Sequence, residues 1–388
     1  MCLSGIIPGR EAPRLQAMNN ILEPIVDEAV ELYETGVYIT RTARFPHGRH
    51  VLGAIWIQAN DLPASRQLSG YPPHMSNLCC HICWVTLQKL DNVDTSQMRL
   101  RVWRVDKAFS LAWRNATSIK EQEELFRKHG IRWSELHRLP YFDAILCSTL
   151  DVMHMFFERM LPHHLHVVWG MHVDAEDGLG LAASRPDSDL SEQQVADAIA
   201  VLERGDKAAL HSLSRAQLRE VHHDLANFRN PSSSQAPPKK PGDPSTGKLK
   251  ASDYEVLGLV NLPTTLIRLW GGLAEGTREK RVLDNYMHLV KAIRLAIAPR
   301  TPEDSILDYS DEIGQYLKAL LELFPGTSIT PYQHMAAHLP LFLRAHGPTH
   351  SWRCWIVERM NFVLQSVHTN HRFSEQGFLT MCPSSAHA

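Results

Sequence analysis

The sequence predicts an α/β protein in which a small N-terminal α/β part is followed by a long helical region and a helical C-terminal part. Two segments carry a strand pattern: residues 37–45 alternate and are rich in β-branched residues, and residues 51–57 form a short apolar run. Residues 14–34 carry apolar side chains at helical spacing. Helix-prone sequence fills most of 96–228 and resumes at 252. We therefore expect strands only near the N-terminus.

The N-terminal part is expected to contain one long helix, two strands and the start of a second helix. Pro24 lies inside the segment 14–34, so we expect the helix to bend or divide there. The sequence PHG at 46–48 can form the turn between the strands. The second strand ends at Asn60 and Asp61, and the sequence LPASRQL then begins another helix.

The middle of the chain is expected to be helical, with one break in composition. Helix patterns occur at 107–116, 119–130, 151–161, 190–205, 252–273 and 306–325. Residues 230–248 are rich in Pro, Ser, Gly and Lys, which predicts a flexible loop without regular structure. We therefore divide the chain into an N-terminal part at 1–95, a helical insertion at 96–325 and a C-terminal helical part at 326–388.

The amino-acid composition limits the classes of protein to which this chain can belong. With 388 residues, 44% of them hydrophobic, the chain can bury a sizeable core. The formal net charge of −2 lacks the overall basicity that is typical of nucleic-acid-binding proteins, although basic faces can exist locally. Seven cysteines in a long chain favour a reducing intracellular compartment over a disulfide framework. No apolar run predicts a transmembrane helix, and the N-terminus does not resemble a signal peptide.

Two short motifs supply the donor atoms of a metal site. Cys80 and Cys83 have the C-x-x-C spacing that lets two thiolates bind one ion, and the motif HMAAH places His334 and His338 on one helical face. Each motif alone is weak, because two buried free thiols or two surface histidines are equally ordinary in a chain with 22 histidines. Together they give the two sulfurs and two nitrogens of a tetrahedral Zn²⁺ site. Such an ion would join the N-terminal part to the C-terminal helices.

Four further residues are candidates for chemistry. Asp61 follows a predicted buried strand, where a carboxylate is held rigidly enough to bind a metal, but an Asp that caps the next helix is the simpler interpretation. Glu358 lies in an apolar, aromatic segment, where it is either paired with a neighbouring arginine or a metal ligand, and the residues alone favour the ion pair. Asp151 and His154 share one helical face. Their simpler interpretation is a helix-capping Asp and a buried His with its hydrogen bonds satisfied.

Taken together, these motifs resemble the transposases of CACTA-type (EnSpm-like) DNA transposons, especially those of mushroom-forming fungi. The resemblance covers nearly the whole chain and rests on motifs that occur in the expected order. They are IIPGREAPRL, GVYITRTARFPHGRHV, NDLPASRQLSGY, CCHIC, HGIRWSELHRLPYFD, LDVMHMFFERML, NLPTTLIRLWG, HMAAHLPLFL, GPTHSWR and ERMN.

The resemblance implies an incomplete RNase H-like core of the DDE transposase type, interrupted by a large all-α insertion. Such a core holds two Mg²⁺ or Mn²⁺ ions between three carboxylates, cleaves DNA at the transposon ends and joins the new 3′-hydroxyl to target DNA. Asp61, shortly before the C-x-x-C motif, matches the middle carboxylate, and Glu358 matches the last. Asp151 and His154 match a D-x-x-H signature in the insertion. The Cys and His pairs would share a structural Zn²⁺.

The sequence also departs from the family pattern. The first carboxylate of the family lies upstream of the motif that matches IIPGRE. We therefore expect that carboxylate, its strand and the usual N-terminal zinc-finger region to be missing from this chain. The C-terminal sequence also diverges after ERMNFVLQSVHTNHRF. The expectation is a truncated, transposase-derived protein with weak or no catalytic activity.

Two other functions compete with this one. The first is a non-catalytic, zinc-stabilised remnant that binds DNA or protein. The second is a histidine-rich metallohydrolase for small molecules, which would need an enclosed pocket lined by histidines. If the resemblance holds, the partners are transposon-end and target DNA in the nucleus, with a homo-oligomer as a further expectation and no membrane involved.

Overall fold

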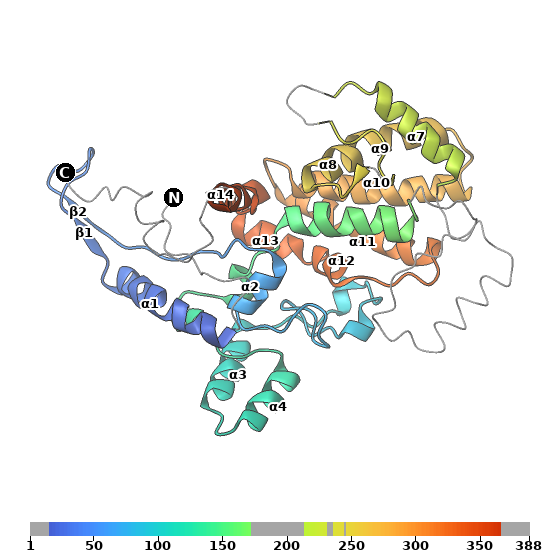
Figure 1. Ribbon diagram of the computed structural model, residues 1–388. Helices are drawn as coiled ribbons and strands as arrows, with labels where there is room; N and C mark the ends of the chain where they lie inside the picture. Colours follow the sequence, from blue (N-terminus) through green and yellow to red (C-terminus); the bar gives the residue numbers. More distant parts are fainter. Residues whose placement is uncertain (1–14, 172–212, 231–235, 244–245, 366–388) are drawn as a thin grey trace.

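The computed structural model describes residues 15–171, 213–230, 236–243 and 246–365. Within these ranges the chain is mostly helical, and its one sheet has two short strands. Figure 1 shows a helical body from which helix α1, a β-hairpin and the α3–α4 pair extend. No helix among the described residues has both the length and the apolar character to cross a membrane. The expected helix at 190–205 lies outside the described residues.

Helix α1 (Leu15–Glu34) confirms the first predicted helix, but it continues through Pro24 without dividing. Leu22, Val26 and Ala29 form its buried stripe, as the helical spacing of these residues requires. The amide of Asn19 fixes the helix against the segment near 135, because it donates to the Trp133 carbonyl (3.3 Å) and accepts from the Glu135 amide (3.1 Å).

The strands are much shorter than the sequence predicts. β1 (Val37–Ile39) pairs antiparallel with β2 (Arg49–Val51), with Tyr38 opposite His50. The predicted strand at 51–57 is wrong beyond Val51, because no neighbouring strand among the described residues pairs with it. Its side chains still alternate between half-buried and exposed, so the backbone is extended but lacks a ladder partner. Pairing resumes only at an isolated parallel bridge between Gln58 and Ser148.

The segment after the hairpin contains short helices that surround the C-x-x-C motif. The elements are α2 (Leu62–Leu68), η1 (Leu87–Lys89), η2 (Thr95–Gln97), α3 (Trp103–Asn115), α4 (Ile119–His129), η3 (Glu135–Arg138) and α5 (Ala144–Cys147). Helix α4 begins at the side-chain cap of Ser118 and ends at Gly130, whose φ of +66° is the left-handed conformation that glycine adopts readily. The predicted helices at 107–116 and 119–130 are thus confirmed.

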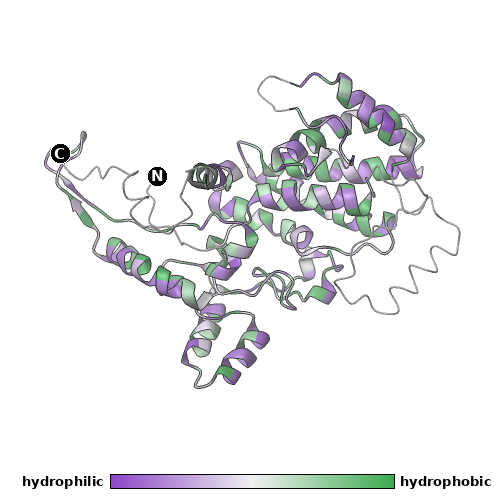
Figure 2. Cartoon of the chain, in the orientation of Figure 1, coloured by the Kyte–Doolittle hydropathy of each residue, from purple (hydrophilic) through white to green (hydrophobic). Residues whose placement is uncertain are grey.

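The helical body is built from the middle of the sequence. Its elements are the π-helices η4 (Met153–Met160), η5 (His163–Val168) and η8 (Leu257–Asn261), and the α-helices α7 (Arg215–Asn227), α8 (Ala251–Val256), α9 (Leu262–Trp270), α10 (Arg278–Ala296) and α11 (Glu303–Leu323). Helices α10 and α11 pack against each other, and their buried residues include Tyr286, Tyr309 and Tyr316. Figure 2 shows that these helices carry both hydrophobic and hydrophilic positions, as expected of amphipathic helices. The described residues of the predicted loop at 230–248 form no α-helix or strand.

The C-terminal elements return to the N-terminal part. They are α12 (Pro331–Ala336), α13 (Leu339–His346), η9 (Thr349–Ser351) and α14 (Trp355–Gln365). One continuous hydrophobic cluster runs from Leu22 to Trp352 and includes side chains from all three expected parts. The large helical portion that the sequence predicts is therefore present, and the small sheet alone does not establish an RNase H-like core.

Candidate metal centre and carboxylate cluster

One buried group of four side chains, which we call the Cys/His cluster, consists of Cys80, Cys83, His334 and His338. One donor atom from each residue lies within 4.8 Å of every other. The Cys83 Sγ and His334 Nε2 atoms are 3.2 Å apart, and the two histidine Nε2 atoms are also 3.2 Å apart. The structure thus brings together the four side chains that the sequence predicted would converge. Two thiols and two imidazoles at this spacing could hold a metal ion.

A tight turn places the two cysteines of this cluster. The backbone N–H of Ile82 donates to the Cys80 sulfur at 3.3 Å, which orients that sulfur inside the turn. An antiparallel bridge between Cys83 and Leu100 then fixes the second cysteine. Cys79, although buried, directs its sulfur toward the Val85 carbonyl at 4.0 Å and is not in the cluster. The C-x-x-C spacing therefore selects Cys80 and Cys83 as predicted.

A break between two helices places the two histidines. Thr330 and Gln333 form a capping box at the start of α12, and His334 lies one turn into that helix. The helix ends at Ala336, and His338 is the N-cap of α13. The expectation of one continuous helix is wrong here, because the helix breaks between the two histidines and α13 restarts with Pro340 in its first turn. Both imidazoles nevertheless point to the same place.

The thiols of the cluster are electrostatically unequal. Burial disfavours a thiolate at Cys80, but hydrogen bonds from Cys83, His334 and His338 outweigh burial and lower the pKa of the Cys80 thiol. The hydrogen bond with Cys80, together with burial, raises the pKa of the Cys83 thiol. A metal cation would favour the thiolate at both positions, since a coordinating thiol is deprotonated.

Arg66 connects this cluster to helix α2. Its guanidinium is buried and donates to three backbone carbonyls of the segment that leads to Cys80: Pro72 (2.6 Å), Cys79 (2.8 Å) and Leu78 (3.4 Å). Burial lowers the pKa of Arg66 to about 10, although its electrostatic interactions with Cys80 and Cys79 favour its charged form. The sequence analysis missed this residue, because the carbonyls that it contacts belong to a segment whose path is set by the tertiary fold.

A second buried cation supports the other side of the turn. Arg101 donates through Nη1 to Asp106 (3.3 Å) and to the His129 carbonyl (3.0 Å), and its Nε lies 3.4 Å from the Cys83 carbonyl. Its guanidinium also lies 4.0 Å from the ring centroid of Trp84. Two buried arginines therefore hold the backbone on both sides of the C-x-x-C motif.

Asp151 and His154 form a hydrogen-bonded pair at the start of η4. The Asp151 Oδ2 atom accepts from the backbone N–H of His154 (2.9 Å) and lies 2.7 Å from its Nδ1. The Asp151 Oδ1 atom accepts from the backbone N–H of Cys354 at 2.6 Å. Asp151 is thus a capping residue, as its simpler interpretation held, and it also joins the insertion to the segment before α14. Both of its oxygens already have donors.

Glu358 lies beside the imidazole of His154, and Asp61 is near enough for its negative charge to act on the same ring. The Glu358 Oε1 atom is 3.9 Å from His154 Nε2, and the side chain is about half exposed at 48%. No ion pair joins Glu358 to an arginine among the described residues, and Arg353 instead stacks on Trp355. The expected ion pair with a neighbouring arginine is therefore not formed. We call Asp61, Asp151, His154 and Glu358 the carboxylate cluster.

Asp61 caps helix α2 with one of its two carboxylate oxygens. Its Oδ1 atom accepts from the Ala64 backbone N–H at 2.8 Å, and its backbone is extended at the N-cap of α2. Its Oδ2 atom has no hydrogen-bond donor among the described residues. Among the described residues, the segment before Asp61 pairs only at the isolated bridge of Gln58, so the expectation that Asp61 ends a buried strand is wrong. The capping interpretation is confirmed, and it leaves the second oxygen available to a ligand.

Charges and hydrogen bonds within the carboxylate cluster shift the pKa values of His154 and Asp151. Burial would lower the pKa of His154, but the hydrogen bond with Asp151 and the negative charges of Asp151, Glu158 and Asp61 outweigh burial and raise the pKa. Burial would raise the pKa of Asp151, but its hydrogen bonds with His154 and Cys354 outweigh burial and lower it. Both shifts favour the charged forms of the pair, an imidazolium beside a carboxylate.

Cys354 is close enough to Asp151 and His154 for three donor atoms to lie within 4.8 Å of one another. Hydrogen bonding rather than metal binding explains this group. Burial, reinforced by the charges of Asp151, Glu358 and Asp61, raises the pKa of the Cys354 thiol well above its usual range. Both Asp151 oxygens already accept N–H donors, so neither is free for an ion.

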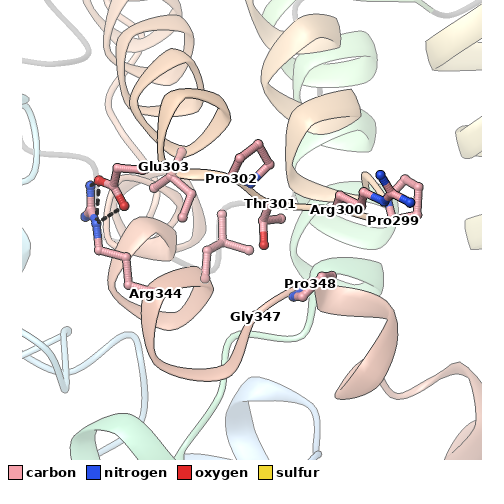
Figure 3. Close-up of a pocket in the computed structure, with 10 residues that line it drawn as sticks. Pro299, Arg300, Thr301, Pro302, Glu303, Arg344, Gly347 and Pro348 are labelled. Atoms are coloured by element: carbon pink, nitrogen blue, oxygen red, sulfur yellow. Dashed lines mark hydrogen bonds and ion pairs between the residues drawn. The ribbon is translucent and has the colours of Figure 1, made fainter.

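A pocket of about 960 Å³ lies between the start of α11 and the end of α13, and no residue of either cluster lines it (Figure 3). Arg344 and Glu303 form a bidentate ion pair on one side of it, with Nη2–Oε1 at 2.6 Å and Nε–Oε2 at 3.2 Å. No histidine lines this pocket. It therefore gives no support to the histidine-rich metallohydrolase.

Comparison with models of known protein families finds no match for this chain, and comparison with curated proteins finds none either. The functional conclusion therefore depends on the two clusters and on the sequence motifs that form them.

Proposed function

We propose that this chain is a zinc-stabilised, transposase-derived protein whose carboxylate cluster binds Mg²⁺ or Mn²⁺ beside DNA. The parent activity is cleavage and transfer of DNA strands at transposon ends. The DNA partner, the nuclear location and the RNase H-like core belong to this proposal. The observation that carries it is spatial: the Cys/His cluster joins residues 80–83 to residues 334–338, and Glu358 of the same C-terminal part lies 3.9 Å from His154 of the insertion.

The donor set of the Cys/His cluster fits Zn²⁺. Two thiolates and two imidazoles are a common ligand set of structural zinc sites, and they give a neutral centre when both cysteines are ionised. All four residues are buried, so no ligand position faces solvent. A closed site of this kind stabilises structure. Its position joins the C-x-x-C turn to α12 and α13, which carries the C-terminal helices onto the N-terminal part.

The carboxylate cluster has oxygen donors of the kind that Mg²⁺ and Mn²⁺ prefer. Asp61 Oδ2 and the half-exposed Glu358 carboxylate are the available ligands. Neither residue belongs to the two close donor groups among the described residues, so binding an ion requires their side chains to move together. Mg²⁺ often binds through only one or two carboxylates and keeps several waters. Two carboxylates therefore suffice for loose binding.

His154 and Asp151 have a positioning role in this proposal. Asp151 fixes the orientation of the imidazole and stabilises its charge, and the other ring nitrogen faces Glu358 at 3.9 Å. A bound divalent ion would supply Lewis-acid stabilisation and an activated water. The imidazolium beside Glu358 adds a positive charge near the position where a DNA phosphate would approach.

We expect the 388-residue chain to cleave DNA weakly or not at all. Two-metal catalysis needs ions about 3.5–4 Å apart, clamped by several carboxylates, and Asp151 is committed to hydrogen bonds. Absence of a third available ligand should slow cleavage by about 10³-fold or more, which corresponds to about 4 kcal/mol of transition-state stabilisation.

The experiment is a cleavage and joining assay on transposon-end DNA with Mn²⁺. The proposal expects stoichiometric zinc, loose Mn²⁺ binding and no strand cleavage. Robust cleavage that disappears in both Asp61→Ala and Glu358→Ala would show instead that Asp151 or another acid completes the site. If the chain holds neither zinc nor Mn²⁺, the proposed function is wrong.

One observation favours a second function. Asp151 uses both oxygens to hold structure, so the carboxylate cluster is also compatible with a zinc-stabilised remnant that binds DNA or protein without catalysis. Such a remnant would retain zinc, and Mn²⁺ and DNA would not compete for the same site. A Mn²⁺ titration with and without DNA separates the two functions.

A further inference from the structure

The β1–β2 hairpin carries positive charge in a stretch that contains no acidic residue. Between Glu34 and Asp61 the sequence has three arginines, Arg41, Arg44 and Arg49, and neither Asp nor Glu. All three arginines are exposed, and none pairs with a carboxylate among the described residues. Clustered cations of this kind mark a surface for a polyanion, even in a chain whose net charge is slightly negative.

The tip of this hairpin is held in one conformation. Thr42 and Phe45 exchange backbone hydrogen bonds of 3.0 and 3.2 Å, and the Gly48 amide donates to the Phe45 carbonyl at 3.1 Å. The Tyr38 hydroxyl donates to the His47 carbonyl at 2.6 Å. Gly48 has a φ of +81°, which allows the chain to return into β2. The backbone of the tip is therefore ordered before a partner binds, which reduces the entropy lost on binding.

An aromatic ring positions one of the arginines. The guanidinium carbon of Arg49 lies 4.6 Å from the centroid of the Phe45 ring, which holds the cation in place on β2. Arg41 and Arg44 lie on the tip itself, on either side of Thr42. The three positive charges thus all lie on the same hairpin, which consists of two short strands and a tight turn.

The hairpin projects away from the helical body at the end of α1 (Figure 1). The neighbouring surface of α1 is acidic, with Glu28, Glu31 and Glu34 exposed. The acidic surface of α1 repels a polyanion, so a polyanion would bind at the hairpin and not at the helix. A partner protein could use the exposed Val37 and Ile39 side chains instead, but three unpaired arginines on a protruding tip favour a phosphate backbone.

The distance to the carboxylate cluster suits duplex DNA. Segment 52–60 joins β2 to Asp61, and the 12 residues from Arg49 to Asp61 span at most about 40–43 Å even when fully extended. One turn of a DNA duplex is about 34 Å long. A duplex held near Asp61 can therefore reach the hairpin within about one helical turn.

We propose that the β1–β2 hairpin is a docking arm for the phosphate backbone of duplex DNA. The inference rests on the proposed function for the choice of DNA as the polyanion, but it needs neither metal ion. Arg41, Arg44 and Arg49 each neutralise a phosphate, and the contact adds affinity without reading sequence.

The test measures binding of a labelled 30-base-pair duplex by fluorescence anisotropy, without added divalent ions, over a range of salt concentrations. The variant is Arg41→Gln/Arg44→Gln/Arg49→Gln. The matched control removes three other exposed arginines that have no partner among the described residues, as Arg104→Gln/Arg127→Gln/Arg281→Gln. A third variant, Arg41→Lys/Arg44→Lys/Arg49→Lys, keeps the charge.

We expect the hairpin variant to bind about tenfold or more weakly at 100 mM salt. The slope of log K against log salt should fall in magnitude by up to about 2.7, because three phosphate contacts are lost. The control and the lysine variant should stay within about threefold of the parent chain. Circular dichroism and zinc content should be unchanged in all variants, so a loss of binding reports the hairpin.

Three results would overturn the inference. The hairpin variant could bind duplex DNA as tightly as the control does. It could lose affinity for single-stranded DNA alone, which would assign the hairpin to unpaired strands. It could keep DNA affinity but change the oligomeric state in size-exclusion chromatography, which would make the hairpin a protein interface. Loss of zinc or Mn²⁺ binding in the parent chain would instead count against the proposed function.

Discussion

The Cys/His cluster and the carboxylate cluster are assembled from overlapping parts of the chain, yet they differ in completeness. The first has four buried donors within 4.8 Å of one another. In the second, Asp151 and His154 are hydrogen-bonded to each other, while Asp61 and Glu358 remain partly exposed. The Cys/His cluster is therefore suited to stabilising the fold. In the carboxylate cluster Asp61 and Glu358 are available to a ligand, and a bound ion or phosphate would have to bring them together.

The largest expected effect comes from breaking the complete centre. Cys80→Ser should abolish stoichiometric metal and lower the free energy of unfolding by about 5 kcal/mol or more, because the binding energy of a structural zinc is folding energy. Metal analysis and urea unfolding check this. The matched control is Cys79→Ser, a buried neighbour outside the cluster, which should retain the metal. Equal metal loss in both variants would mean that the turn, rather than its donors, determines binding.

Arg66 tests whether a buried cation positions the cysteines of the complete centre. Arg66→Met leaves three carbonyls without a donor and should cost about 2–4 kcal/mol, because hydrogen bonds from a charged group contribute more than neutral ones. Zinc affinity should fall by about 10–100-fold, as for other residues that orient metal ligands. Urea unfolding and zinc competition measure the two effects. Arg104→Met, on an exposed site, should change stability by less than about 0.5 kcal/mol.

Asp151→Asn separates hydrogen bonding from charge in the carboxylate cluster. We expect a loss of about 2 kcal/mol, because an amide group would face N–H donors that the carboxylate accepts. The pKa of His154 should fall toward its ordinary value, because burial then acts without the neighbouring charge. NMR titration of His154 measures this shift. A His154 pKa that does not move would remove the basis for the imidazolium beside Glu358.

The same pair predicts a pH dependence. The pKa of His154 is raised by folding, so its stabilisation is present below the ordinary histidine pKa and is lost as pH rises through the raised value. The pKa of Asp151 is lowered, so its stabilisation is lost as pH falls through that lower value. The stability difference between the parent chain and Asp151→Asn should therefore peak at about pH 4–6.5. Urea unfolding across that range checks the sign, and a difference that grows above pH 8 would contradict it.

The smallest expected effect distinguishes the two roles of Asp61. Asp61→Ala should cost about 1 kcal/mol through loss of the helix cap, whereas Asp61→Asn should cost almost nothing, because Asn caps helices as well as Asp does. Both variants should weaken Mn²⁺ binding, measured by electron paramagnetic resonance. If Asp61→Asn binds Mn²⁺ normally, Asp61 is a structural cap alone.

Sequence reasoning succeeded where a property is local. The apolar spacing in α1, α4 and α11 predicts those helices closely, because amphipathic periodicity depends on near neighbours. The donors of the Cys/His cluster were also predictable, since thiols and imidazoles at these spacings have few other uses in combination. Cys80 and Cys83 were chosen over Cys79 by spacing alone, and the structure agrees.

Sequence reasoning failed where a property depends on distant partners. Residues 52–57 have a strand pattern, but a strand forms only beside another strand, and none lies there among the described residues. Glu358 was expected to pair with a nearby arginine, but its neighbour is His154 from the insertion. Arg66 gave no signal, because its three carbonyl partners come together only in the folded chain.

The central claim is that one Zn²⁺ joins the C-x-x-C turn to the histidines of α12 and α13. Zinc K-edge X-ray absorption on the purified 388-residue chain tests it most directly. The account predicts one zinc per chain, with two sulfurs at about 2.3 Å and two nitrogens at about 2.0–2.1 Å. In His334→Ala the second nitrogen should be lost or replaced by water. A chain without stoichiometric zinc, or with a shell of oxygen and nitrogen only, would contradict the account.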